Sequence, residues 1–168
     1  MDELDGRYRW IGQMASAEFD VLLASVDLLL SANVSAMTLS KAFLVGTPSI
    51  VIQNSVDAET IDDVVEQIKF LSPNIESWLN ATLPLFPFRL WPLGYYRFLE
   101  PLLKDNPFCD ACPTIELLDE EKFKRVCSDL LFNESGRQSL ICSQDEYIAK
   151  VRSLPNAASV IDAILCKA

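Results

Sequence analysis

Hydroxyl, amide and amine side chains gather between two apolar runs near the start of the chain. Asn33, Ser35 and Thr38 follow the first run directly, and Lys41 lies three residues further on. Hydroxyl and amide groups donate hydrogen bonds to phosphate oxygens, and an ammonium group balances their charge. At the start of a helix, free backbone N–H groups such as that of Ala36 and the positive end of the dipole also favour an anion. The spacing therefore predicts a phosphate site in this segment.

Each of these residues also has a purely structural interpretation. Asn33, Ser35 and Thr38 are residue types that cap helices, an effect worth about 0.5–2 kcal/mol without any ligand. Lys41 is equally typical of the solvated face of a helix. The sequence leaves both interpretations open.

A second polar group follows the second apolar run, at Gln53, Asn54 and Asp57. Amide and carboxylate groups at the end of a strand can hydrogen-bond to a base or a sugar, and the same residues also form ordinary polar turns.

The elements that would position both groups form one compact unit. The near-continuous apolar runs at 27–31 and 49–53 are typical of strands buried on both faces of a parallel sheet. Between them we expect a helix over 35–45, capped by Asn33 or Ser35 and ended by Gly46 and Pro48. In open parallel sheets ligands bind beyond the carboxyl ends of the strands, where both polar groups lie.

Helices and one further strand surround this unit. The spacing predicts helices over 14–25 and 57–70, a strand over 114–118, a helix capped by Asp119 and reaching 132, and helices over 135–154 and 156–167. The alternation of helix and strand predicts an α/β fold, with a Rossmann-like parallel sheet flanked by helices in a single domain over residues 1–168.

Residues 71–113 interrupt the alternation with prolines and aromatic residues. We expect an irregular connection with short helices over 74–79 and 95–103. The aromatic side chains between Phe86 and Phe98 either fill the core beneath this connection or form an apolar face that awaits a partner domain.

Composition excludes several functions. The net charge of −10 argues against a nucleic-acid partner. The chain contains no histidine, which removes the commonest general base and most catalytic zinc sites. Five cysteines and a polar start without a signal-peptide pattern favour the cytoplasm. The most apolar region, 83–103, carries four prolines and three charged residues, so we expect no transmembrane segment.

Cys109 and Cys112 form a Cys-x-x-Cys motif, which is typical of zinc or redox sites. A structural zinc site needs two further ligands and Cys127, Cys142 and Cys166 form no second pair, so we expect no metal. A redox enzyme that uses these two cysteines is one hypothesis for the function, besides the two given below.

The segment SANVSAMTLSKAFLVGTPSIVIQN resembles the donor-binding segment in the C-terminal half of GT-B glycosyltransferases. The resemblance covers residues 13–70 and 113–168 and implies that Thr38 contacts the donor diphosphate, that Asn33 stands where the family has a histidine, and that Asp57 lies where an acidic residue binds the sugar. The chain departs from the family at Ser35, where a glycine is expected, and at Lys41, where a glutamate is common. The whole chain also resembles GT-B-like proteins of unknown function.

This resemblance implies a nucleotide-sugar-binding half-domain without a cofactor or a metal. The catalytic residues stay unassigned, because GT-B enzymes place the acceptor site and the base in an N-terminal half. We therefore expect the chain to be inactive by itself. Its partner would be an N-terminal half supplied as a separate chain, or further copies of the chain in a homo-oligomer. The alternative is a non-catalytic interaction protein whose nucleotide-sugar site has decayed.

Overall fold

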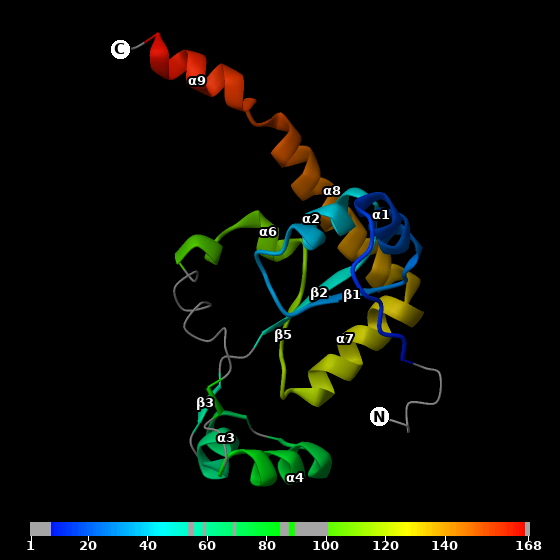
Figure 1. Ribbon diagram of the computed structural model, residues 1–168, viewed down its shortest axis with the longest axis vertical. Helices are drawn as coiled ribbons and strands as arrows, with labels where there is room; N and C mark the ends of the chain where they lie inside the picture. Colours follow the sequence, from blue (N-terminus) through cyan, green and yellow to red (C-terminus); the bar gives the residue numbers. More distant parts are fainter. Residues whose placement is uncertain are drawn as a thin grey trace.

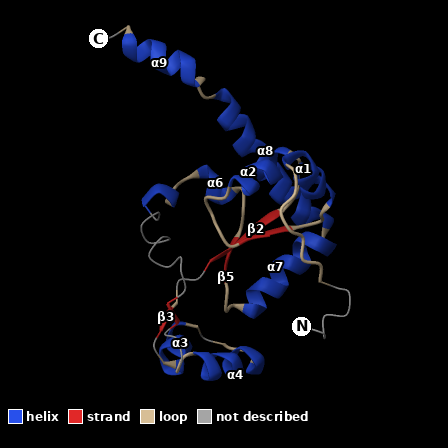
Figure 2. Cartoon of the chain, viewed as in Figure 1, coloured by secondary structure: helices blue, strands red, loops and turns tan. Residues whose placement is uncertain are grey.

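The computed structural model describes residues 8–53, 56–58, 60–68, 70–84, 88–89 and 101–166. Helices surround a small central group of strands (Figure 2). The helices are α1 (Ser16–Ser25), α2 (Met37–Leu44), α3 (Ile61–Gln67), α4 (Pro73–Thr82), α6 (Pro107–Asp110), α7 (Glu120–Phe132), α8 (Glu134–Ser153) and α9 (Ala157–Leu165). The strands are β1 (Leu29–Ser31), β2 (Ser49–Gln53), β3 (Asp57–Ala58), β4 (Phe88–Arg89) and β5 (Thr114–Glu116).

The main sheet is parallel, with strand order β1-β2-β5. Leu30 pairs with Ile50 and Ile52 pairs with Ile115, so the apolar centres of the three strands lie side by side. The expected parallel pairing of these strands is confirmed. All three strands consequently end at the same edge of the sheet.

Helices cover both faces of this sheet. On one face, Leu39 and Phe43 of α2 pack with Val51 of β2 and with Tyr147 and Ile148 of α8. On the other face, a second cluster joins strands β2 and β5 to helices α7 and α8 through Ile50, Ile115, Leu130 and Leu140. Helix α8 contributes to both clusters and therefore joins the two layers.

The turn between α2 and β2 is built as its sequence indicates. Gly46 has φ of +71°, and the hydroxyl of buried Thr47 donates to the carbonyl of Leu23 at 2.8 Å. A left-handed glycine ends the helix at low steric cost, and the Thr47 hydrogen bond ties the end of α1 to the start of β2. This turn fixes the register of the central strand.

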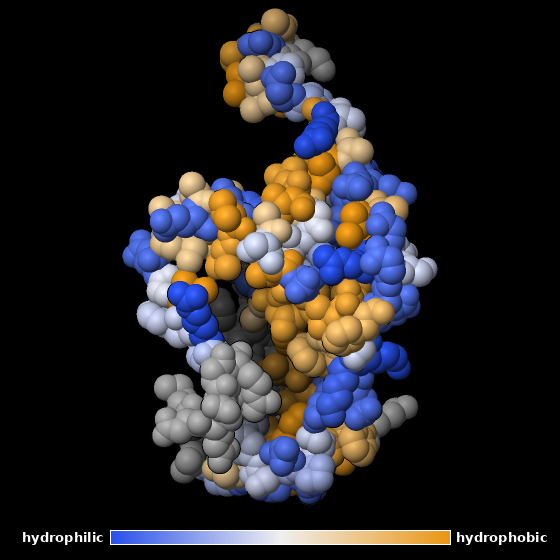
Figure 3. All heavy atoms as spheres, turned by 90° about the vertical axis from the view of Figure 1, so that its right-hand side faces the viewer, coloured by the Kyte–Doolittle hydropathy of each residue, from blue (hydrophilic) through white to orange (hydrophobic). Residues whose placement is uncertain are grey.

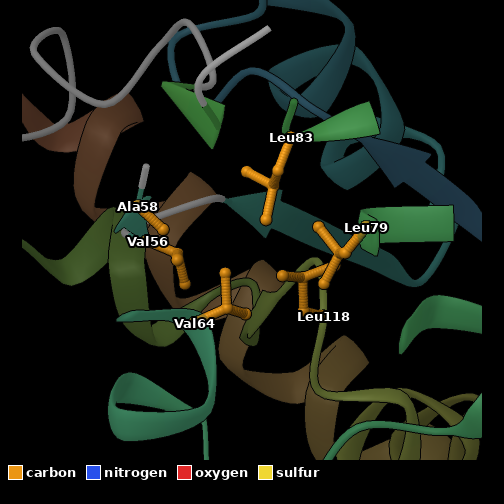
Figure 4. Packing of buried hydrophobic residues seen from close by; sticks show 6 residues of the cluster. All are labelled: Val56, Ala58, Val64, Leu79, Leu83 and Leu118. Atoms are coloured by element: carbon orange, nitrogen blue, oxygen red, sulfur yellow. The ribbon is translucent and has the colours of Figure 1, made fainter. Parts of the chain in front are cut away.

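A smaller lobe, made of β3, β4, α3 and α4, lies beyond the main sheet (Figure 1). Strands β3 and β4 pair antiparallel, and the lobe has its own cluster of buried side chains (Figure 4). Leu118, from the turn after β5, belongs to this cluster and joins the lobe to the sheet. The members of the cluster are Val56, Ala58, Val64, Leu79, Leu83 and Leu118.

The lobe corrects two expectations. The helix expected over 57–70 is shorter, because Thr60 and Asp63 form a capping box that starts α3 at Ile61. The connection expected to be irregular contains α4, which begins after Ser72 with Pro73 in its first turn and extends beyond the short helix expected there. The helix expected over 95–103 and the aromatic block from Phe86 to Phe98 lie largely outside the described residues.

The apolar spacing within the helices also predicts that Met37, Val65 and Leu131 belong to the stripes that face the core, and these three residues are exposed instead. Met37 is 80% exposed, Val65 is 50% exposed and Leu131 is 39% exposed. Val65 and Leu131 lie directly beside the buried residues Val64 and Leu130, so the apolar stripe that packs is narrower than the sequence pattern suggests.

At the carboxyl end of the chain, α8 leaves the sheet and α9 projects away from the rest of the molecule (Figure 1). Pro155 separates these two helices, as expected. Among the described helices, none combines the length and the apolar character needed to cross a bilayer.

Gly46 offers the first test of this architecture. Replacement by alanine should lower the free energy of unfolding by about 1–2 kcal/mol, because a Cβ is disfavoured at positive φ. Gly46→Asn should cost less, since asparagine tolerates this conformation. Urea unfolding measures both variants, and equal stability of Gly46→Ala and the wild type would contradict the left-handed turn.

Gln144 on α8 offers the second test. Its side chain is completely buried, and no described residue provides a hydrogen-bond partner for either amide atom. A buried unsatisfied polar group costs about 1–3 kcal/mol, so Gln144→Leu should stabilise the fold by an amount of this order. The matched control is Gln138→Leu, at an exposed position of the same helix. Loss of stability in Gln144→Leu alone would show that the amide does have a partner, such as a bound water.

Candidate functional site

The three strands of the main sheet all end in polar residues at the same edge. Ser31, Gln53 and Glu116 are the last residues of β1, β2 and β5. Gln53 lies directly beside Glu116, and its amide nitrogen Nε2 donates to Glu116 Oε1 at 2.7 Å. A parallel sheet thus presents one polar edge, which is where ligands bind in folds of this kind.

The turn after β1 is organised by Asn33. Its Oδ1 accepts hydrogen bonds from the backbone N–H and the hydroxyl of Ser35, at 3.0 and 2.9 Å. The Ser31 hydroxyl accepts from the N–H of Asn33 at 3.2 Å and donates to its carbonyl at 3.0 Å. The bonds to Asn33 Oδ1 make an Asx turn and those of the Ser31 hydroxyl make an ST turn, and together they fix the path of the chain between β1 and α2.

This turn corrects the expectation that Asn33 or Ser35 caps the helix. The N-cap residue of α2 is Ala36, whose side chain cannot accept a hydrogen bond. The Asx turn uses the Asn33 side chain before the helix begins, so α2 starts two residues later than expected. The first helical N–H groups are therefore left for another acceptor.

Met37 and Thr38 carry these N–H groups. Within the described parts of the chain, neither their N–H groups nor the Thr38 hydroxyl has an acceptor. Thr38 is half-buried, so its side chain is neither in the packed core nor fully solvated. Free N–H groups and the positive end of the helix dipole suit an anion at this position.

Lys41 points to a different element. Its Nζ lies 2.6 Å from Asp20 Oδ1 and 3.3 Å from the Ser16 hydroxyl, both on α1, and 6.0 Å from the centre of the Phe19 ring. These contacts hold the ammonium group against α1. In this arrangement Lys41 joins two helices.

The remaining expected site residues are only partly described. Asn54 lies outside the described residues, and Asp57 is described only by its backbone, which pairs with Arg89. Asp57 belongs to β3 rather than to the start of a helix. Gln53 Oε1 is buried, and no described group lies within hydrogen-bond distance of it.

Glu116 is a member of this edge that sequence reasoning missed. It also lines a cavity of about 350 Å³ together with Gln67, Ile68, Phe70, Asp119 and Glu121. The signal in the sequence was its place at the end of the strand beginning at Thr114, where the same rule that selected Gln53 selects Glu116.

A link between α4 and α7 holds the lobe beside this cavity. Glu120 hydrogen-bonds to Lys124 and to the hydroxyl of Ser72, and these bonds, with that to Lys124 first, hold the pKa of Glu120 below its ordinary value. Ser72 is the N-cap of α4, so the contact joins the lobe to the start of α7.

The environment of the Cys-x-x-Cys motif raises the pKa of both thiols, whereas reactive redox cysteines have a lowered pKa. Burial, with a smaller contribution from Cys109, raises the pKa of Cys112 from 9.0 to about 12. Burial and then Asp110 also raise the pKa of Cys109. Both thiols therefore stay protonated at neutral pH, and a protonated thiol is a poor nucleophile for thiol–disulfide exchange. All five cysteines are free, and in the described part of the chain no three His, Cys, Asp or Glu side chains are placed to hold a metal ion.

Comparison with known proteins assigns the family. A family model described as a family of unknown function, DUF6365, matches residues 2–168. The chain belongs to this family. No curated protein and no solved structure matches the chain. Nothing in these comparisons points to a glycosyltransferase, so an activity has to be argued from the site.

The cysteines give a test of these environments. At pH 8, iodoacetamide should modify exposed Cys142 and Cys166 within minutes and should modify Cys112 only after unfolding, because the thiolate is the reactive form. Peptide mass spectrometry measures each rate. Rapid labelling of Cys112 in the folded protein would contradict its burial.

Cys112 also predicts a pH dependence. Its pKa is higher in the folded chain than in the unfolded chain, so its contribution to stability is complete below pH 9 and is lost as the pH rises toward about 12. Cys112→Ala should remove this contribution and flatten the stability profile over that range. A wild-type and a variant profile with the same slope there would contradict the shift.

Proposed function

We propose that the chain binds the diphosphate of a nucleotide sugar at the N-terminus of α2, and that it is the donor-binding part of a GT-B-like glycosyltransferase. The observation that carries this proposal is the uncapped start of α2 at the carboxyl end of β1. A diphosphate oxygen would accept hydrogen bonds from the N–H groups of Met37 and Thr38 and from the Thr38 hydroxyl. The Asx turn of Asn33 and Ser35 holds these donors in place before a ligand arrives.

The polar edge next to this turn suits the rest of such a donor. Gln53 Oε1 is buried without a described partner, so a base or a sugar hydroxyl that entered beside it would donate the hydrogen bond that this atom lacks. The carboxylate of Glu116, held beside Gln53, is an acceptor of the kind that binds ribose or sugar hydroxyls. The diphosphate and the sugar or nucleoside would thus lie across the ends of neighbouring strands.

Transfer of the sugar would need a partner. A general base must lie within hydrogen-bond reach of the acceptor hydroxyl, and the sequence offers no histidine for that role. The start of α2 contributes donors that stabilise a departing diphosphate, which is one part of the reaction. A separate N-terminal half would supply the acceptor site and the base, so the chain by itself binds the donor without turnover.

Lys41 favours a second candidate function. In donor sites of this kind a basic side chain near the diphosphate would strengthen binding, and here the closest lysine of α2 is paired with Asp20 on α1. A chain that keeps the fold but no longer binds a nucleotide sugar would act as an interaction protein. The experiment below separates the two functions.

Thermal unfolding in the presence of UDP-, GDP- and dTDP-sugars tests the proposal. One of these ligands at ten times its dissociation constant should stabilise the chain by about 1.4 kcal/mol and raise its Tm. Thr38→Ala should weaken binding by about tenfold or more, since a hydrogen bond to a charged group contributes about 1.5–3 kcal/mol.

Ser40→Ala is the matched control, because Ser40 lies on the same helix but about 200° around its axis from Thr38. Its Tm shift should equal that of the wild type. The absence of any shift with all three nucleotide classes at millimolar concentration would favour the interaction protein instead.

A further inference from the structure

The C-terminal arm, residues 150–166, has an apolar surface that the rest of the fold does not cover. Every described side chain of the arm is exposed. Hydrophobic residues gather on α9 at the top of the molecule (Figure 3). The exposed fractions are 43% for Val160, 55% for Ile161, 63% for Ile164 and 68% for Leu165.

These residues form one stripe along α9. Ala157, Val160, Ile161, Ile164 and Leu165 follow the spacing i, i+3, i+4, i+7 and i+8, which places them on one face of a helix. Ser159 lies opposite the centre of that face. A nine-residue helix with such a stripe is marginally stable alone in water and gains its stability from packing.

We propose that this stripe is the interface of a homodimer, in which the arms of two copies pack antiparallel. Complementary charges favour a second copy of the chain as the partner and favour antiparallel packing of the two arms. The last turn of α8 carries Lys150 and Arg152, while α9 carries Asp162 and has the negative end of its dipole at its C-terminus. Antiparallel packing brings the basic start of each arm, with Lys150 and Arg152, toward the C-terminal end of α9 in the other copy.

The length of the arm removes the main obstacle to self-association. Each chain carries a net charge of −10, so direct contact between two bodies would be repulsive. Nine helical residues span about 13 Å, which exceeds the Debye length of about 8 Å at physiological salt. Two arms side by side therefore bury their apolar stripes while the acidic bodies stay apart and screened.

This geometry also disfavours an anionic membrane surface as the occupant. Such a surface attracts helices with many Lys and Arg residues on the polar face. The described polar face of α9 instead has Ser159 and Asp162. The proposal is independent of nucleotide-sugar binding, because the arm lies away from the ends of the strands (Figure 1).

Sedimentation equilibrium of the whole chain tests the proposal. The interface is small, so we expect a reversible equilibrium between an 18.8 kDa monomer and a dimer of twice that mass, with dimer visible at about 100 μM protein and 0.15 M salt.

Five variants locate the interface. Ile161→Glu should abolish the dimer, and Ile164→Ala, which keeps a good helix former, should weaken it severalfold. Ser159→Glu adds the same charge on the opposite face and should leave the dimer intact. Arg152→Glu should weaken the dimer, whereas Lys104→Glu, the same reversal of charge at an exposed position outside the arm, should not.

Two results would overturn the proposal. A wild-type chain that stays monomeric at every concentration would leave α9 to a different protein or to a membrane. A dimer that Ile161→Glu and Ser159→Glu affect equally would place the interface elsewhere.

Discussion

The parallel pairing of β1, β2 and β5 is the constraint on which the rest of the structure depends. Parallel neighbours cannot be joined by a tight turn, so α2 must cross from the end of β1 to the start of β2. The same pairing places Ser31, Gln53 and Glu116 at one edge and the start of α2 beside them. Packing of Leu39 and Phe43 then fixes the crossing helix on the sheet. The candidate site is a consequence of this topology.

Sequence reasoning succeeded where local and long-range signals agree. The apolar run of β2, Asp119 as the cap of α7, and Gly46 as the end of α2 all appear where their residue types require them. It was less successful where a side chain had two possible partners. The Asn33 side chain accepts a hydrogen bond from the N–H of Ser35 and does not cap α2. Lys41 binds Asp20, which lies 21 residues earlier in the chain. Such choices depend on tertiary neighbours that a single sequence does not reveal.

The structure of the lobe was also only partly predictable from the sequence. Thr60 and Asp63 form a capping box whose sequence signal was present, yet the broader apolar spacing predicted a longer helix. The pairing of β3 with β4 joins segments about thirty residues apart, and two-residue strands leave almost no periodic signal. The lobe is nevertheless tied to the sheet through Leu118 and through the Ser72–Glu120 contact, which places it beside the polar edge.

The central claim is that the start of α2 is an anion site. Two-dimensional ¹H–¹⁵N spectra of the labelled chain, recorded during titration with UDP and separately with inorganic pyrophosphate, test it most directly. The account predicts that the largest saturable shifts belong to the amides of Met37 and Thr38, that both ligands produce them, and that the amides of α9 do not move. Saturable shifts confined to another part of the chain, or none at millimolar ligand, would contradict it.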